Sequence, residues 1–256
     1  ASGHLAVAST PQSAPDGYTI VIGQTDNMIL GPHLYAKVGY DTLNGFEPII
    51  QVSESALVIV SRTVGSAVGT RLQSLKDIVA LGRSKGVTWA TPGSGSMPYM
   101  VGEAFKSATA IQLLQVPYRG AGPALIDLIG GSVDVAMMTV PSVLPLVRSG
   151  KISPIAVSTT KRAGMLPDTP TLSELGVKVD ARVWLGLFAP AGTPSTIVSR
   201  INSEVNKILQ MPDVKEQVAS GGATVVGGSS SEFGRLVKND YAYWGAVVKA
   251  SGVKLD

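Results

Sequence analysis

The residues best suited to chemistry lie in a loop of small residues at 91–96, with the sequence TPGSGS. The loop follows a short β-prone run, 87–90, and precedes apolar residues at helical spacing. The first backbone N–H groups of a helix are unpaired and its dipole favours negative charge, so this arrangement could hold an anion. Donors would come from Ser94, Gly95 and Ser96. The alternative is an ordinary turn between a strand and a helix, in which glycine and serine are also common.

Other chemistries fit the sequence less well. No Lys-Ser or Lys-Thr pair follows the glycines, as in a nucleotide P-loop, and the G-x-G-x-x-G order of a dinucleotide site is missing. A hydrolase with Ser94 or Ser96 as nucleophile is a rival hypothesis. The chain has no G-x-S-x-G motif, however, and no evident acid orients its two histidines, His4 and His33. Because cysteine is absent as well, we expect no enzyme, no cofactor and no metal site.

The order of strand, loop and helix occurs twice more along the chain. A strand at 113–117 precedes the turn YRGAGP at 118–123, and a strand at 133–140 precedes a helix at 141–150. This alternation indicates an α/β fold with a mainly parallel sheet and right-handed crossovers. Such sheets bind ligands at the carboxyl ends of their strands, where the three loops should meet. There Arg119 could give an acidic ligand a fixed positive charge, or it could be a solvated surface residue.

A further candidate loop follows the strand expected at 18–23. It contains Thr25, Asp26 and Asn27, which are small polar residues at the end of an apolar run. The alternative is structural, because Asp26 and Asn27 could simply cap the next helical turn.

The composition describes a compact globular protein. Of its 256 residues, 45% are hydrophobic and 15% charged, with 29 glycines and 16 prolines, which allows two lobes joined by tight connections. The net charge is only +3, and no cluster of Lys and Arg interleaves with aromatic residues, so we expect no nucleic-acid partner. No apolar run approaches the roughly 18 residues of a membrane span, and no signal peptide is visible at the N-terminus.

Seven short motifs occur along the chain in a fixed order. They are APDGYT at 14–19, GSGSMP at 93–98, VPYRGAGPA at 116–124, PS at 141–142, KR at 161–162, PDTPT at 167–171 and APAGTP at 189–194. In this combination the chain resembles the periplasmic substrate-binding proteins of tripartite tricarboxylate transporters, the TctC or Bug family. The resemblance runs from about Ala1 to Val253. It implies a two-lobed α/β binding protein of the type II periplasmic kind, which closes on a small organic acid and delivers it to membrane permease subunits.

The resemblance also implies where the lobes and the ligand loops lie. We expect lobe 1 at 1–60 and 185–256 and lobe 2 at 61–184, with crossovers near Val60 and Trp184. Family members begin with a further strand, a carboxylate-gripping loop and a helix, so we expect this first unit of lobe 1 to be missing. The ligand-binding residues by this resemblance are Thr25, Asp26, Asn27, Ser94, Gly95, Ser96, Tyr118, Arg119, Gly120, Ala121, Met138, Thr139 and Trp184.

One departure from the family pattern bears on the ligand. Many relatives carry an Asp two residues before a turn of the Leu-Pro-Ser type, where it can pair with an amino group, but this chain has Met138 there, followed by Thr139. A ligand ammonium would lose its charge partner, at about 2 kcal/mol or more. We therefore predict a mono-, di- or tricarboxylate without an α-amino group. Met137 and Met138 would suit an apolar or aromatic body, or they could fill the core. A protein that presents the acid to a sensor, or the sensing domain of a regulator, is the alternative.

Overall fold

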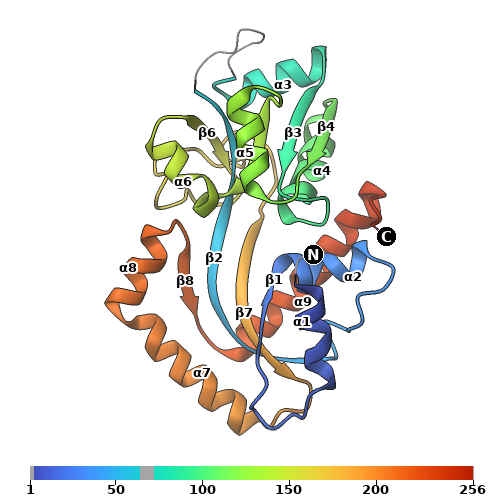
Figure 1. Ribbon diagram of the computed structural model, residues 1–256, viewed down its shortest axis with the longest axis vertical. Helices are drawn as coiled ribbons and strands as arrows, with labels where there is room; N and C mark the ends of the chain where they lie inside the picture. Colours follow the sequence, from blue (N-terminus) through green and yellow to red (C-terminus); the bar gives the residue numbers. More distant parts are fainter. Residues whose placement is uncertain (1–2, 64–71, 256) are drawn as a thin grey trace. The chain divides into compact units, whose positions relative to one another are not determined.

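The computed structural model describes residues 3–63 and 72–255 (Figure 1). The chain forms two compact units, unit 1 from Ala1–Glu54 and Val183–Asp256 and unit 2 from Ser55–Arg182. Their boundaries fall a few residues from the lobe boundaries expected at 60/61 and 184/185. That the two units act as closing lobes stays a prediction.

Unit 2 contains a five-stranded sheet in the order β6-β2-β5-β3-β4. β3 pairs in parallel with β4 and β5, whereas β2 is antiparallel to β5 and β6, so four strands point the same way and β2 runs against them. The strands are β2 (Phe46–Arg62), β3 (Val87–Thr91), β4 (Leu113–Pro117), β5 (Val135–Thr139) and β6 (Ile152–Val157). The helices are α3 (Leu75–Ser84), α4 (Met97–Thr109), α5 (Ala121–Gly130) and α6 (Val140–Arg148).

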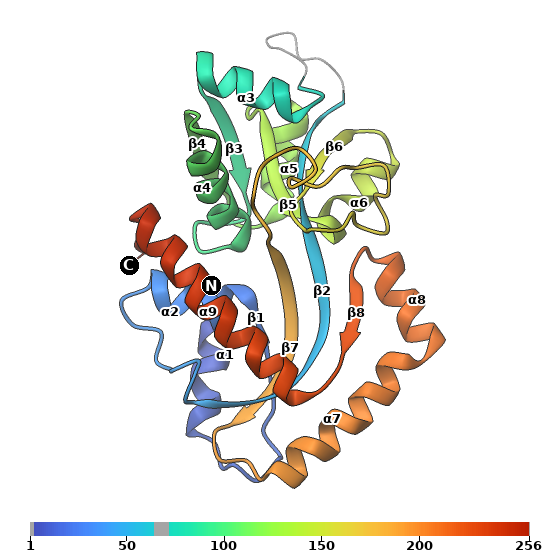
Figure 2. The ribbon, with the colours of Figure 1, turned by 180° about the vertical axis from the view of Figure 1, so that it is seen from behind.

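Helices cover both faces of this sheet (Figure 2). Every second residue of a strand points to the same face. On one face of the sheet such residues, among them Ala90 and Met138, form a buried cluster with apolar residues of α5 and α6. On the other face, Trp89 of β3 stacks on Phe105 of α4 with ring centroids 5.3 Å apart. This alternation follows from the period of two in a strand. In chain order, β3 leads into α4, β4 leads into α5 and β5 leads into α6.

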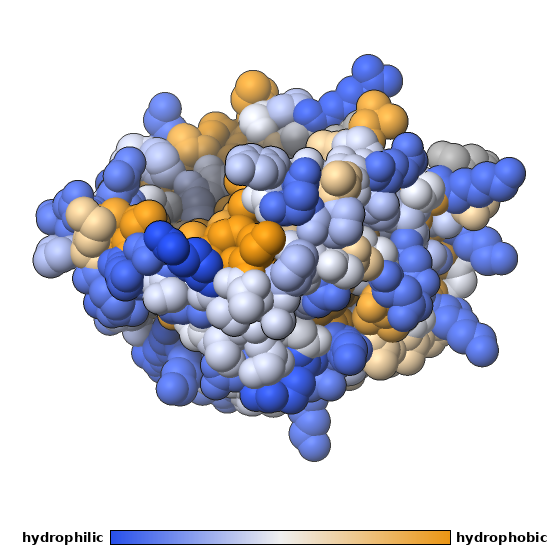
Figure 3. All heavy atoms as spheres, turned by 90° about the horizontal axis from the view of Figure 1, so that it is seen from below, coloured by the Kyte–Doolittle hydropathy of each residue, from blue (hydrophilic) through white to orange (hydrophobic). Residues whose placement is uncertain are grey.

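Unit 1 is built around β1 (Val21–Gln24), β7 (Arg182–Pro190), the first half of β2 and β8 (Thr224–Gly227). β1 is antiparallel to β7, and β8 is antiparallel to β2. The helical segments are α1 (His4–Ser9), η1 (Thr10–Gln12), the π-helical turn η2 (Thr25–Leu30), α2 (Gly31–Leu34), α7 (Ser195–Gln210), α8 (Pro212–Ser220) and α9 (Ser230–Ser251). Leu5 and Ile22 of this unit are exposed apolar residues. In the space-filling view of Figure 3, hydrophobic residues form patches between hydrophilic ones. Among the described helices, none combines the length and apolarity needed to cross a membrane.

Two local predictions were wrong. The apolar runs at 49–52 and 56–60 predict two separate strands. They are instead one strand, β2, in which residues 51–54 pair with β8 and residues 57–61 pair with β5. The polar residues between these runs mark the passage from one unit to the other rather than a turn. The second wrong prediction concerns Ser142, whose residue type and place near the start of the expected helix at 141–150 predict that it caps this helix. The helix instead begins at Val140 with Thr139 at its N-cap, and the Ser142 hydroxyl donates to the Thr139 carbonyl at 2.8 Å.

Candidate functional site

Ser96 directly precedes apolar residues at helical spacing and is therefore predicted to be an N-cap, and the loop between β3 and α4 has this geometry. Ser96 is the N-cap of α4, with its hydroxyl accepting from the Tyr99 N–H at 3.4 Å and donating to the Gly93 carbonyl at 2.6 Å. Ser94 and Gly95 form the half-buried turn before it. Within residues 3–63 and 72–255, neither of their N–H groups makes a hydrogen bond. The loop therefore presents unpaired backbone donors beside a helix N-terminus.

The loop between β4 and α5 lies against the first loop. The Tyr118 N–H donates to the Thr91 carbonyl and the Gly120 N–H to the Pro92 carbonyl, each at 2.9 Å. Gly120 is the N-cap of α5 with a φ of 112°, a conformation that glycine adopts readily. Because glycine has no side chain, it cannot cap the helix with a side-chain hydrogen bond. The N–H of Ala121 thus has no partner in the described part of the chain. A second helix N-terminus with open donors stands next to the first.

Two side chains of the second loop differ in their surroundings. The Tyr118 hydroxyl donates to Oδ2 of Asp127 at 2.6 Å. Desolvation, followed by this hydrogen bond and the charge of Asp127, raises the pKa of Tyr118 to about 12. Arg119 is exposed and forms no ion pair with the described residues. The tyrosine is therefore held in place within unit 2, whereas the guanidinium is available to an anion.

The third loop, between β5 and α6, places its two candidate residues differently. Thr139 is half-buried at the end of β5, and its hydroxyl donates to that of Ser142 at 3.2 Å. Met138 is fully buried and lies in the core cluster, opposite Val58 of β2. Met138 therefore fills the core, which was the alternative considered for it. A contact between Met138 and a ligand stays a prediction.

The candidate residues of unit 1 are engaged in structural hydrogen bonds. Thr25 is fully buried, and its hydroxyl accepts from the Trp184 N–H at 2.9 Å. Oδ1 of Asn27 accepts from the Gln24 N–H at 2.9 Å within a reciprocal capping box. Asp26 is half-buried in the first turn of η2. The capping alternative accounts for Asn27, and a ligand role for these residues stays a prediction.

Trp184 belongs to the aromatic core of unit 1. Its side chain is fully buried, contacts Phe233 edge to face with ring centroids 5.3 Å apart, and donates from Nε1 to Oδ2 of Asp240 at 2.8 Å. These contacts fix the ring in the core, so the contact with a ligand suggested by the resemblance stays a prediction.

The electrostatics of the unit 2 edge favour anions. The segments 91–96, 117–121 and 139–142 contain Arg119 and no Asp or Glu. Helix N-termini add partial positive charge through their dipoles and open N–H groups. Thr91 begins the predicted loop but was not among the predicted ligand-binding residues. It is fully buried, and its hydroxyl has no hydrogen-bond partner in the part of the chain that the structure describes. No sequence signal marks it, because threonine is an ordinary strand residue.

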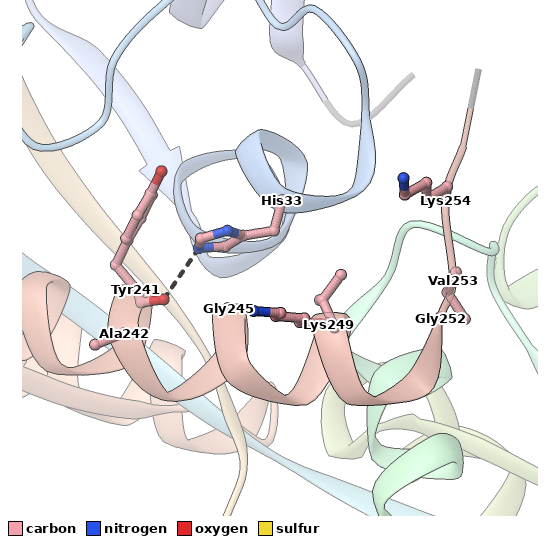
Figure 4. A pocket seen from close by; sticks show the side chains of 9 residues that line it. His33, Tyr241, Ala242, Gly245, Lys249, Gly252, Val253 and Lys254 are labelled. Atoms are coloured by element: carbon pink, nitrogen blue, oxygen red, sulfur yellow. Dashed lines mark hydrogen bonds between the residues drawn. The ribbon is translucent and has the colours of Figure 1, made fainter.

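A cavity of about 440 Å³ in unit 1 was also not predicted. His33 and Tyr241 form one wall, with the imidazole Nε2 donating to the Tyr241 carbonyl at 3.0 Å, as Figure 4 shows. Lys249 of α9 and Lys254 of the C-terminal segment also line it, and both are exposed. Its cations thus remain solvated, in contrast to the buried or helix-terminal donors at the edge of unit 2.

Comparison with known proteins decides the family. A family model described as "Tripartite tricarboxylate transporter family receptor" matches residues 1–253. The chain belongs to this TctC family. The predicted family is thereby confirmed, as is the expectation that the protein is not an enzyme, because this is a family of solute receptors.

Individual relatives of the TctC chain agree with this assignment. BugT of Bordetella pertussis is 30% identical over 259 residues, which cover 100% of this chain and 78% of BugT. Rpa4515 of R. palustris, solved with adipate, superposes with a TM-score of 0.87 at 29% identity, over 98% of this chain and 84% of that one. BugD gives 0.83 at 28% identity, over 99% and 85%. MatC of Rhodopseudomonas palustris, solved with malate, gives 0.81 at 27% identity, over 97% and 85%. The α/β periplasmic binding protein fold is thereby confirmed.

Proposed function

We propose that this TctC-family chain captures a small organic carboxylate without an α-amino group in the periplasm and delivers it to membrane permease subunits. The observation that carries the proposal is the pairing of two helix N-termini at one sheet edge. The open N–H groups of Ser94 and Gly95 beside α4, and that of Ala121 at the start of α5, are suited to carboxylate oxygens.

The solved relatives support the ligand class. Rpa4515 was solved with adipate and MatC with malate, and both ligands are dicarboxylates that lack an amino group. The three unit 2 segments have no Asp or Glu to pair with an ammonium, and Met138 at the family's acidic position lies in the core. An ammonium placed there would be desolvated without a charge partner.

Hydrogen bonds of this kind are strong enough for capture. A charge-assisted hydrogen bond contributes roughly 1.5–3 kcal/mol, and micromolar affinity requires about 8 kcal/mol after ordering costs. Several such bonds from helix N-termini therefore suffice without metal or covalent chemistry. The closure of two lobes that the resemblance implies would add to this by removing the ligand from water.

Calorimetric titration with matched acids tests the ligand class. Succinate and aspartate differ only by the amino group, and adipate and malate extend the series. We expect binding of the acids without an amino group and none of aspartate. Binding of aspartate alone would contradict the prediction drawn from Met138, and a failure of all four to bind would overturn carboxylate capture.

A proline substitution tests the backbone donors directly. Ala121 is the first residue of α5, a position where proline fits and removes only the N–H. Ala121→Pro should weaken acid binding about tenfold or more, as the loss of one charge-assisted hydrogen bond predicts. Ser230→Pro makes the same change at the start of α9 and should leave affinity unchanged. The permease partner is tested by uptake of labelled acid in cells with and without the permease subunits.

A further inference from the structure

The buried polar side chains that lack a hydrogen-bond partner among the described residues lie on two neighbouring strands. In the part of the chain that the structure describes, three buried side-chain nitrogen or oxygen atoms lack a hydrogen-bond partner: Nε1 of Trp89, Oγ1 of Thr91 and Oε1 of Gln115. All three residues lie on the neighbouring strands β3 and β4. Buried polar atoms without partners are rare in folded proteins, so such a cluster calls for a bound group that satisfies it.

The three side chains share the face of the sheet that α4 covers. Trp89 stacks on Phe105 of α4, and Thr91 lies two residues further along the same strand, so both point to that face. Gln115 pairs with Trp89 in register, and its Nε2 donates to the Tyr99 carbonyl of α4 at 2.7 Å. Ala90, between the two β3 residues, instead belongs to the core on the opposite face.

Thr91 is the member of this cluster nearest the candidate site. It is the last residue of β3, and the loop at 92–96 leads directly from it to the capped N-terminus of α4. Its carbonyl accepts from the Tyr118 N–H at 2.9 Å, which fixes the strand end against the second loop. Trp89 and Gln115 pair with each other and lie two residues before the last pair of these strands, Thr91 and Pro117. An indole donor and an amide acceptor are complementary, and one ordered water could satisfy both.

We propose that the Thr91 hydroxyl is a ligand contact that hydrogen-bonds an oxygen of the bound acid. This inference rests on the proposed function, since it supplies the partner that the hydroxyl lacks. A hydroxyl can donate to a carboxylate or hydroxyl oxygen of the ligand, and its burial makes the bond selective against a ligand with a methyl group at that point. Thr91 would then discriminate between acids by what they place above β3.

The test compares Thr91→Val with Thr91→Ser. Valine replaces the unpartnered hydroxyl by a methyl group of similar size, so the ligand-free protein should melt at the same temperature or higher. Its affinity for the tightest binder among succinate, adipate and malate should fall about tenfold or more, because the ligand oxygen is left unpaired. Serine keeps the hydroxyl and should retain affinity within a few fold. Bound acid is first removed by unfolding and refolding, and titration calorimetry and scanning calorimetry then report affinity and melting.

Thr88→Val on the same strand is the matched control. The Thr88 hydroxyl donates to Oδ2 of Asp134 at 2.6 Å and accepts from the Asp134 N–H at 2.8 Å. Its removal should lower the melting temperature and leave the affinity unchanged, the reverse of the effect expected for Thr91.

The outcomes separate the two proposals. If the wild-type protein binds an acid and Thr91→Val binds it equally well, only the inference about Thr91 fails. It also fails if Thr91→Val melts at a lower temperature like Thr88→Val, because the hydroxyl would then have a partner in the free protein. If the wild-type protein binds none of the acids, the proposed function fails and the Thr91 inference fails with it.

Discussion

Replacement of Ser158 by alanine should be among the most destabilising small changes in unit 2. Ser158 is fully buried. Its hydroxyl accepts from the Leu57 N–H at 3.0 Å and donates to the Ala181 carbonyl at 2.6 Å. One side-chain oxygen thus connects β2, the segment after β6 and the segment before β7.

The magnitude follows from the two groups that alanine would leave unpaired. A buried donor or acceptor without its partner costs about 1–3 kcal/mol, so an N–H and a C=O together set a range of about 2–6 kcal/mol. The backbone bonds Ser158 N–H to Leu57 carbonyl and Ala181 N–H to Ser158 carbonyl remain. We therefore expect the lower half of the range, about 3 kcal/mol, for Ser158→Ala.

Urea unfolding of the ligand-free protein, followed by circular dichroism, measures this change as a shift in midpoint at constant slope. Ser84→Ala is the control, because the exposed Ser84 hydroxyl donates only to carbonyls of its own helix, those of Ala80 and Leu81. Its effect should stay within about 0.5 kcal/mol. A loss below about 1 kcal/mol for Ser158→Ala would refute the reasoning, because it would show that water satisfies both groups.

Two further changes test packing and charge. Gly245→Ala places a Cβ 2.6 Å from the His33 ring. We expect the free energy of unfolding, measured by thermal unfolding, to fall by about 1–3 kcal/mol despite the better helix propensity of alanine. Gly130→Ala in α5 is the control and should not lower stability, because nothing lies within 4 Å of its added Cβ. Hydrogen bonds, first that from the Gln73 N–H, lower the pKa of Asp77 in the folded protein. The stability that the Asp77 carboxylate contributes is therefore complete above its unfolded pKa of about 4 and is lost as the pH falls through its folded pKa. Asp77→Asn should flatten the acid limb of a stability–pH curve, and an unchanged slope would contradict this assignment.

Local signals in the sequence predicted the elements well where a few neighbouring residues decide the structure. The spacing Ser229-x-x-Glu232 predicts a capping box. It is confirmed, because the Glu232 N–H donates to the serine hydroxyl at 3.2 Å and the Glu232 carboxylate accepts from the Ser229 N–H at 2.9 Å. The Ser96 cap is confirmed for the same reason. Thr193 stands just before Pro194 and an amphipathic pattern, which predicts that it caps α7. Its hydroxyl instead donates to the Pro190 carbonyl, and the N-cap is Pro194. A competing local acceptor decided that case.

The rest of the site could not be predicted because it depends on distant parts of the chain. The burial of Met138 depends on its register with β2, some 80 residues earlier in the chain. Among the described residues, none forms a hydrogen bond with the Thr91 hydroxyl, and this is a property of the packed fold that the sequence does not show. The cavity beside His33 likewise requires the C-terminal segment, where the Leu255 N–H donates to the Leu34 carbonyl at 2.8 Å.

The order of the strands along the chain has a consequence for how the protein is made. Unit 2 is one continuous stretch, Ser55–Arg182, whereas unit 1 is completed only by Val183–Asp256. Val21 of β1 pairs with Phe188 of β7, so this pairing can form only after β7 has emerged. Whether the chain leaves a ribosome or a translocation pore, its middle can fold before β1 and β7 pair.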